Sequence, residues 1–143
     1  MDLADLLSTE EAVWYTLEHP VTYEPLTDDK GNLMRVALLG PDSAPAKAVE
    51  QKISADMLQR VSKSRRGRLD MTSEMTESHA RRRFMARVSN WENLVLGKKP
   101  FVYNDENKTK LCDDPAFGPI KRQIEAALGD DQLFIKQANS PSD

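Results

Sequence analysis

The chain has few of the residues on which catalytic and metal sites depend. It contains one cysteine, two histidines and six glycines among 143 residues. A single cysteine cannot form an internal disulfide, which suits a reducing cytoplasm. His19 and His79 are far apart in the sequence, and Cys112 has neither a histidine nor another cysteine near it. Metal sites need such ligands at close spacing, so we expect no bound metal.

Motifs for nucleophilic catalysis and for phosphate binding are also missing. Cys112 is followed by Asp113 and Asp114, and carboxylates beside a thiol raise its pKa and weaken it as a nucleophile. The glycines are scattered, whereas a phosphate-binding loop needs them clustered before a helix. We therefore expect a protein that is not an enzyme and that uses no cofactor.

Long apolar runs are absent. No run approaches the roughly 18 residues of a membrane-spanning helix. The first residues lack the basic head and apolar stretch of a signal peptide. We expect no contact with a membrane and a place in the cytoplasm.

Aromatic and apolar residues are scarce, and charged residues are abundant. Hydrophobic residues make up 39% of the chain, aromatic residues 6% and charged residues 30%. Such a composition predicts a thin core with elongated, charged helices around it. A surface of this kind is often completed by a partner protein.

Charge is distributed unevenly along the chain. Residues 1–40 carry eight acidic and two basic residues, whereas residues 41–95 carry eleven basic and seven acidic ones. This asymmetry favours contacts between copies, or with a charged partner. The strongest basic clusters form a possible charged contact face, which consists of Lys63, Arg65, Arg66, Arg68, Arg81, Arg82 and Arg83.

Basic clusters can bind phosphates, but a nucleic-acid-binding domain is usually basic as a whole. The net charge here is −3. Glu74 and Glu77 lie at helical spacing from the arginines and offer local pairing. We therefore favour a solvated or protein-binding face over one that binds nucleic acid.

Hydrophobic periodicity predicts strands near the beginning and helices afterwards. Residues 1–12 form a short acidic amphipathic segment with Leu3, Leu6 and Leu7 on one face. Residues 13–19 and 33–39 are strand candidates around a turn-rich stretch, which predicts a β-hairpin. Helices are expected from a cap at Asp42 or Ser43, from residues 70–73 to about Val95, from Asn104 to about 111, and from 115 to 128.

We expect a mainly α fold, a helical body of four to five helices with a small N-terminal β-hairpin. Residues 1–143 form a single domain in this prediction, with an acidic segment and hairpin in 1–40. The helical body occupies 41–138, and 139–143 form a mobile tail. Within the second helix, an apolar stripe is expected at helical spacing, at Phe84, Val88, Trp91 and Val95. Gly97 would end that helix, and Lys98 and Lys99 would lie where its dipole favours cations.

The order of several short motifs resembles one protein family. Residues 20–26 are PVTYEPL, residues 40–43 are GPDS, and residues 120–124 are IKRQI. Between them, Trp91 follows an arginine-rich helix and Phe101 precedes a segment that ends at Leu111. This order resembles the tail assembly chaperones of long-tailed, siphovirus-type bacteriophages over nearly the whole chain.

Two positions depart from the pattern of that family. Tyr23 stands where a glycine is common, so we expect a looser turn there than one that requires glycine. Lys108 stands where alanine is frequent.

The resemblance implies a function without catalysis. Such chaperones bind the tape measure protein, keep it soluble and help to recruit tail tube subunits. They act in the host cytoplasm and are absent from the mature virion, and a longer form is often made by ribosomal frameshifting. The implied partners are the tape measure protein, the tail tube protein and further copies of the chain. The alternative is a structural virion component, such as a head–tail connector or a tail completion protein.

A partner-binding patch is expected where apolar residues follow the arginine-rich segment. An amphipathic helix of a tape measure protein could be covered by such a patch through helix-in-groove packing. The candidate residues for partner binding or self-association are Trp91, Leu94, Val95, Phe101 and Val102.

Overall fold

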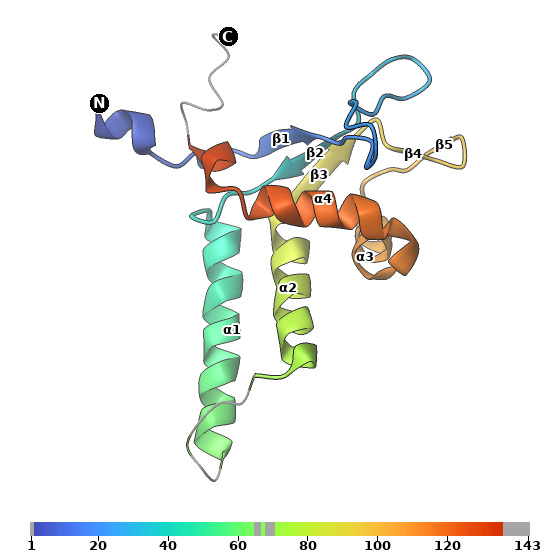
Figure 1. The fold of residues 1–143 in the computed structure, drawn as a ribbon. Helices are drawn as coiled ribbons and strands as arrows, with labels where there is room; N and C mark the ends of the chain where they lie inside the picture. The colour runs from blue at the N-terminus through green and yellow to red at the C-terminus, as the bar shows by residue number, and fades with distance from the viewer. Residues whose placement is uncertain (1, 65–66, 68–70, 136–143) are drawn as a thin grey trace.

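The structure is a computed structural model that describes residues 2–64, 67 and 71–135. Three strands form an antiparallel sheet in the order β1-β2-β3, with β1 (Val13–Thr16), β2 (Arg35–Leu38) and β3 (Val88–Glu92). Helices α1 (Ala44–Lys63) and α2 (Ser73–Arg87) run side by side away from the sheet and form a stalk (Figure 1). The rest, including α3 (Asp105–Asp113) and α4 (Gly118–Leu128), forms the head.

Short elements complete the head. A two-stranded hairpin pairs β4 (Val95–Leu96) with β5 (Lys99–Pro100). Single 3₁₀ turns are η1 (Leu3–Leu6), η2 (Pro115–Phe117) and η3 (Asp131–Phe134). The predicted tail 139–143 lies outside the described residues.

The predicted mainly α fold is wrong, because strands hold the centre of the head. Within the described residues there are four α-helices, but the sheet has three strands and not the two of a small hairpin. The fold is therefore mixed α/β. The predicted helical body 41–138 is interrupted by β3, which adds the third strand to the sheet.

The predicted N-terminal hairpin is confirmed. Its strands pair in an antiparallel register that sets Val13 opposite Leu38 and Tyr15 opposite Val36. Of the two caps predicted for α1, Asp42 or Ser43, the structure has Ser43, whose hydroxyl accepts a hydrogen bond from the amide of Ala46.

The second predicted helix ends eight residues early. It stops at Arg87, and Val88 begins β3 without an intervening loop. In β3, Val88 pairs with Leu38 and Asn90 pairs with Ala37, so Ser89 is an extra residue in a β-bulge. A regular strand would turn Val88 and Trp91 to opposite faces, but the bulge lets both be buried. Two buried residues three positions apart, Val88 and Trp91, therefore gave the pattern that is typical of one face of a helix.

The predicted helix end at Gly97 is wrong for the same reason. Gly97 and Lys98 are the two central residues of the β4–β5 turn, with φ of 59° and 66°. Positive φ at both positions is the requirement of a type I′ hairpin turn. Lys98 and Lys99 thus lie at a hairpin tip and not at the end of a helix.

The looser turn expected at Tyr23 is not observed. Tyr23 adopts φ of 61°, in the left-handed region that favours glycine. The turn is closed by hydrogen bonds from the amide of Tyr23 to the carbonyl of His19, 2.9 Å, and from the amide of His19 to the carbonyl of Glu24, 2.8 Å. The side chain of Tyr23 is exposed, so this residue occupies a glycine-like conformation without packing that offsets its strain.

One apolar core joins the sheet to α2, α3 and α4. Its least exposed members include Val36 and Leu38 from β2, Phe84 from α2, Leu111 from α3 and Ile124 from α4. Of the two stalk helices, α1 buries only Ala46, Val49 and Ile53, and none of these belongs to the core cluster that contains Phe84 of α2. The prediction of a thin core with elongated charged helices is therefore confirmed for the stalk.

Lys108 stabilises the junction at which α2 leads directly into β3. Its side chain is only 9% exposed, and its ammonium donates to the carbonyls of Met85, 2.8 Å, and Val88, 3.3 Å. It also donates to the hydroxyl of Tyr103 at 3.1 Å. The last carbonyls of a helix lack partners within the helix, and a cation there is favoured by the helix dipole. Lys108 from α3 thus caps the end of α2.

Replacing Lys108 is expected to destabilise the head. The Lys108→Met change keeps an apolar stem but removes the ammonium donor from the part-buried carbonyl of Met85, and it leaves the carbonyl of Val88 with the 3.4 Å hydrogen bond from the hydroxyl of Tyr103. We expect a loss of about 1–3 kcal/mol in the free energy of unfolding. Urea unfolding followed by circular dichroism measures it, with Lys110→Met on the exposed side of α3 as the control. A Lys108→Met chain as stable as its control would contradict this capping role.

Candidate protein-binding groove

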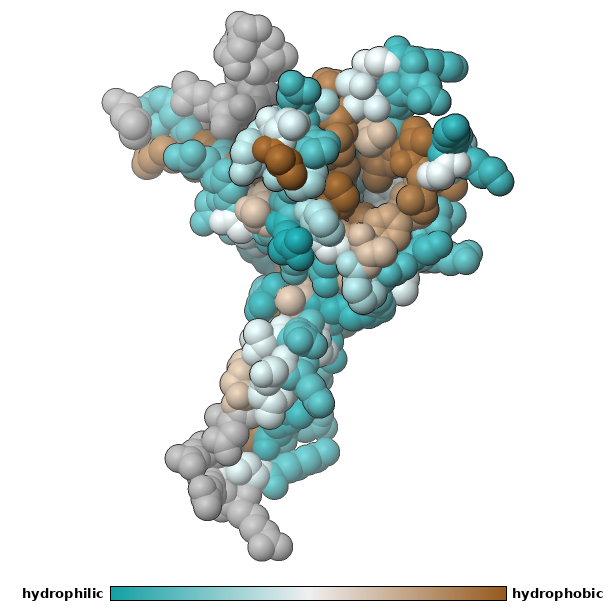
Figure 2. Space-filling model, turned by 45° about the vertical axis from the view of Figure 1, so that its right-hand side comes forward, coloured by the Kyte–Doolittle hydropathy of each residue, from teal (hydrophilic) through white to brown (hydrophobic). Residues whose placement is uncertain are grey.

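An apolar groove opens on the head, between the long β1–β2 connection, the β4–β5 hairpin and the start of α4. Its volume is about 340 Å³. Figure 2 shows the hydrophobic surface gathered in a hollow of the head, while the stalk on this face is mostly hydrophilic. The lining residues are Leu17, Leu26, Met34, Leu94, Val95, Leu96, Phe101, Leu111, Ala116, Phe117, Pro119 and Ile120.

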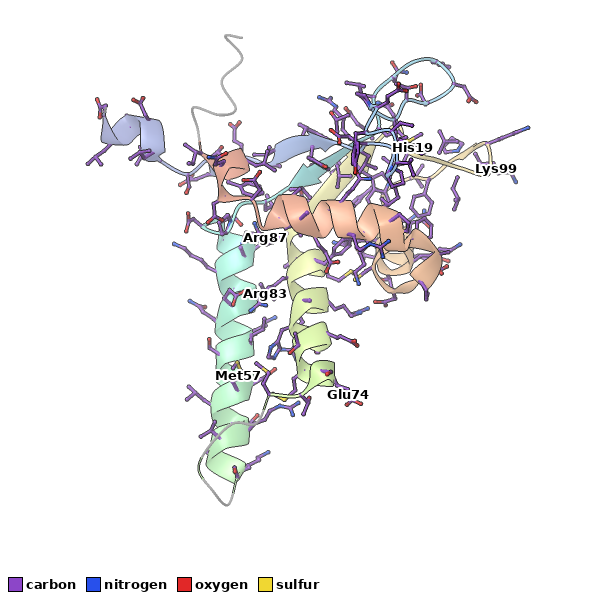
Figure 3. All side chains as sticks on the ribbon, viewed as in Figure 1. His19, Met57, Glu74, Arg83, Arg87 and Lys99 are labelled. Atoms are coloured by element: carbon purple, nitrogen blue, oxygen red, sulfur yellow. The ribbon has the colours of Figure 1, made fainter. Side chains whose placement is uncertain are left out.

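The β4–β5 hairpin forms one wall of the groove. The type I′ turn at its tip brings Leu96 opposite Lys99, and a hydrogen bond of 2.8 Å from the amide of Phe101 to the carbonyl of Leu94 closes its base. Leu96 is 46% exposed within this wall. Lys99 projects from the tip of the hairpin (Figure 3).

Stacked aromatic rings support the groove from below. Trp91 stacks on Phe101 with ring centroids 5.4 Å apart, and Phe101 stacks on Phe117 at 5.5 Å. Trp91 also meets the edge of Tyr103 at 5.1 Å and donates a 2.6 Å hydrogen bond from Nε1 to the carbonyl of Phe101. These contacts tie the groove to the buried sheet, so its floor is already formed before a ligand binds.

Gln123 fixes the opposite wall. Its side-chain oxygen accepts from the amide of Glu18 at 2.9 Å, and its side-chain nitrogen donates to the carbonyl of the same residue at 2.5 Å. The amide group thus pairs with the backbone beyond β1 as a neighbouring strand would. It positions Phe117, Pro119 and Ile120 of η2 and α4 against the β1–β2 connection. Gln123 is the glutamine of the IKRQI motif, whose structural role sequence reasoning did not assign.

The five residues predicted to bind a partner are divided between the core and the surface. Leu94, Val95 and Phe101 line the groove, although Leu94 and Phe101 are largely buried. Trp91 is 4% exposed and lies beneath the groove, in contact with Phe101. Val102 is 57% exposed but is not part of the lining. The groove residues from the β1–β2 connection and from α4 were not foreseen.

The predicted charged face is partly engaged within the molecule. Arg81 pairs with Asp113 of α3 at 2.9 Å, and Arg82 pairs with Asp56 of α1 at 2.6 Å. These partners come from other helices and not from Glu74 and Glu77, the acids expected to pair locally. Lys63 is exposed at the end of α1. Arg65, Arg66 and Arg68 lie outside the described residues.

Arg83 joins the two helices of the stalk. Its guanidinium donates to both carboxylate oxygens of Glu50 on α1, at 2.5 and 3.2 Å (Figure 3). The hydrogen bond from Arg83 is the largest cause that lowers the pKa of Glu50. Both side chains remain nearly half exposed, at 43% and 49%, so solvent screens the pair.

Breaking this pair is expected to have a small effect that depends on pH. Arg83→Met lowers the free energy of unfolding by about 1 kcal/mol or less near neutral pH. Because folding lowers the pKa of Glu50, the pair stabilises fully above the ordinary value of 4.5 and loses its effect as the pH falls through the lowered value. Urea unfolding midpoints measured over that pH range show whether the stabilities of variant and parent become equal in acid. A difference in urea midpoint that stays constant into acid would exclude the ion pair as its cause. Arg60→Met, which removes an exposed basic residue from the neighbouring helix α1, controls for the loss of one positive charge from the stalk.

Cys112 and the polar side chains around it are the other candidate site among the described residues. Cys112 is 2% exposed and lies within the core. Burial is the largest effect that raises the pKa of its thiol, and the neighbouring carboxylate of Asp113 raises this pKa further. Among the described residues, no group of three or more His, Cys, Asp or Glu is placed to hold a metal ion. A polar cavity of about 530 Å³ between α2, α3 and α4 is lined by mixed charges, including Arg81, Asp113 and Lys121.

Comparison with known proteins gives no relative from which a function could be transferred. The chain matches no family model, and no curated protein and no solved structure shows significant similarity to it. In the part of the chain that the structure describes, no helix is both long enough and apolar enough to cross a membrane. The groove is therefore interpreted from its own geometry and chemistry.

Proposed function

We propose that this chain is a phage tail assembly chaperone that binds the tape measure protein and keeps it soluble until the tail is built. The observation that carries the proposal is the apolar groove of the head, with its preformed aromatic floor. The motif order from the PVTYEPL turn to the IKRQI helix supports the choice of family. Both motifs lie at walls of the groove, because Leu26 and Ile120 belong to its lining.

The groove suits an amphipathic helix. Its volume of about 340 Å³ is at the small end of the range for binding pockets, enough for a few apolar side chains from one face of a helix. Helix-in-groove recognition uses anchors at i, i+3, i+4 and i+7. A tape measure protein is a long helical chain, and its apolar stripe would repeat such anchors many times.

Many copies on one long chain gain affinity from one another. Each groove covers only a short stretch of helix, so a single contact is weak. Copies that bind neighbouring stretches and also contact each other act at a high effective concentration. A coat of this kind would keep the tape measure protein soluble, and tail tube subunits would replace it as the tail grows.

Co-expression tests the proposal directly. The tape measure protein from the same genome is produced with and without this chain, and its soluble fraction is compared. We expect it to be soluble only in the presence of the chain and to co-purify with it. Equal solubility in both cultures would overturn the proposal. Detection of the chain in purified virions would favour instead a structural component such as a head–tail connector.

A further inference from the structure

Three leucines near the beginning of the chain are exposed and are not covered by the described residues of their own copy. Leu3 is 77% exposed, and Leu6 and Leu7 are 51% exposed. They belong to or follow η1, which contains no buried residue. Asp2 caps this turn by accepting a 3.0 Å hydrogen bond from the amide of Ala4. The segment 2–7 thus displays apolar side chains on a short preformed turn, and such clusters on a surface mark interaction sites.

The segment is held away from the groove of its own copy. Its base is fixed to the head, because the amide of Thr9 donates to the carbonyl of Phe134 at 2.7 Å and the hydroxyl of Ser8 donates to Asp42 at 2.5 Å. From this anchor, η1 projects at the end of the head opposite the β4–β5 hairpin (Figure 1). The hairpin forms a wall of the groove, so the leucines cannot reach that groove within one molecule.

The charge of the β4–β5 wall complements the segment, whereas the β1–β2 connection on the other side of the groove carries the acids Glu18, Glu24, Asp28 and Asp29. Residues 1–12 contain four acidic residues and no basic one. The β4–β5 hairpin beside the groove contains Lys98 and Lys99 and no acidic residue. Asp114 also lies near the groove, but its carboxylate caps η2 by accepting from the amide of Ala116 at 2.9 Å. Asp2 and Asp5 of an entering segment would therefore meet the two lysines.

We propose that the acidic leucine segment of one copy, residues 2–7, occupies the apolar groove of a second copy. This inference rests on the groove being a binding surface, as the proposed function does, but it does not depend on the identity of the partner. The contact is heterologous, because donor segment and acceptor groove are different surfaces. It joins copies head to tail, and each added copy again offers a free segment and a free groove.

Self-association and partner binding then compete for one site. A partner helix that enters the groove displaces the segment of the neighbouring copy. The segment protects the apolar groove from nonspecific contacts while no partner is present, and its short length leaves it easy to displace.

Sedimentation equilibrium of the full chain tests the contact. We expect the average mass to rise with concentration for the parent chain. In Leu3→Ala/Leu6→Ala/Leu7→Ala, each lost side chain is expected to weaken association by about tenfold. Leu58→Ala is the matched control, because Leu58 is 70% exposed on the stalk and should leave association unchanged. Equal association of the triple variant and the parent would overturn the proposal, as would a parent that stays monomeric at millimolar concentration.

A peptide locates the acceptor. The probe is a synthetic peptide of residues 2–12, added to the triple variant in a Trp14→Phe background. Trp91 is then the remaining tryptophan, and it stacks on Phe101 of the groove. We expect a saturable change in its fluorescence, and none with a peptide in which the leucines are replaced by serine. A flat titration would overturn the proposal. The tape measure protein is absent from both measurements, so their failure is distinguishable from failure of the proposed function.

Discussion

A Leu96→Asp chain is expected to fold normally and to lose the ability to keep the tape measure protein soluble. Leu96 is 46% exposed in the wall of the groove, so an aspartate there remains hydrated in the free protein. When a partner helix covers the wall, the carboxylate must lose its water among apolar side chains, and Lys99, its cross-strand neighbour, offsets part of that cost. The remaining desolvation cost is on the order of 1–3 kcal/mol, which corresponds to a loss of binding of about tenfold to a hundredfold.

The experiment compares soluble tape measure protein in co-expression with the parent and variant chains. Leu58→Asp is the matched control, because it places the same charge on an exposed leucine of the stalk, far from the groove lining. Thermal unfolding of both purified variants checks that each remains folded. If Leu96→Asp protects the tape measure protein as well as Leu58→Asp does, the groove is not the binding site.

Local signals in the sequence were enough for the elements that begin at strong caps or turns. Ser43, Thr72 and Asn104 each accept a hydrogen bond at the start of a helix, and residues 13–16 and 35–38 pair as the alternating pattern predicts. These features depend on side chains within a few residues of one another, so periodicity and capping rules describe them.

The strand β3 was missed because its apolar spacing arises from tertiary pairing. Phe84 lies in the last turn of α2, which ends at Arg87, and Val88 begins β3, so the four-residue spacing of a helix is kept although the second residue belongs to a strand. The bulge at Ser89 exists only because β2 is present beside it. The cap that ends α2 comes from Lys108, twenty residues farther along the chain. None of this is encoded in a short window of sequence.

The sequence predicts only part of the groove, because the rest is brought together by tertiary structure. Its apolar residue types are visible in the sequence, so Leu94, Val95 and Phe101 could be selected as a group. Which of them is buried depends on the hairpin turn at Gly97 and on the aromatic stack under it. The opposite wall comes from residues about 70 positions away at Leu26 and about 25 away at Ile120, which only the folded chain brings together.

The largest effect on stability is expected at the floor of the groove. Replacing the buried Trp91 by alanine removes the stack on Phe101 and the edge contact with Tyr103. It also deprives the carbonyl of Phe101 of its 2.6 Å hydrogen bond. Removal of a buried tryptophan costs about 3–5 kcal/mol, a large share of the about 5–15 kcal/mol that stabilises a typical domain.

Urea unfolding followed by circular dichroism measures this loss, since tryptophan fluorescence would change with the substitution itself. Trp14→Ala is the matched control, because Trp14 is 39% exposed on β1 and the guanidinium of Arg35 lies over its ring, 5.2 Å from the ring centre. We expect Trp91→Phe to lie between the two, since a phenylalanine keeps an aromatic ring on Phe101 and loses only the hydrogen bond and some volume. If Trp91→Ala costs no more than Trp14→Ala, the aromatic stack does not support the groove. If Trp91→Phe is as damaging as Trp91→Ala, the hydrogen bond to the Phe101 carbonyl, and not the ring contact, holds the β4–β5 hairpin against the head.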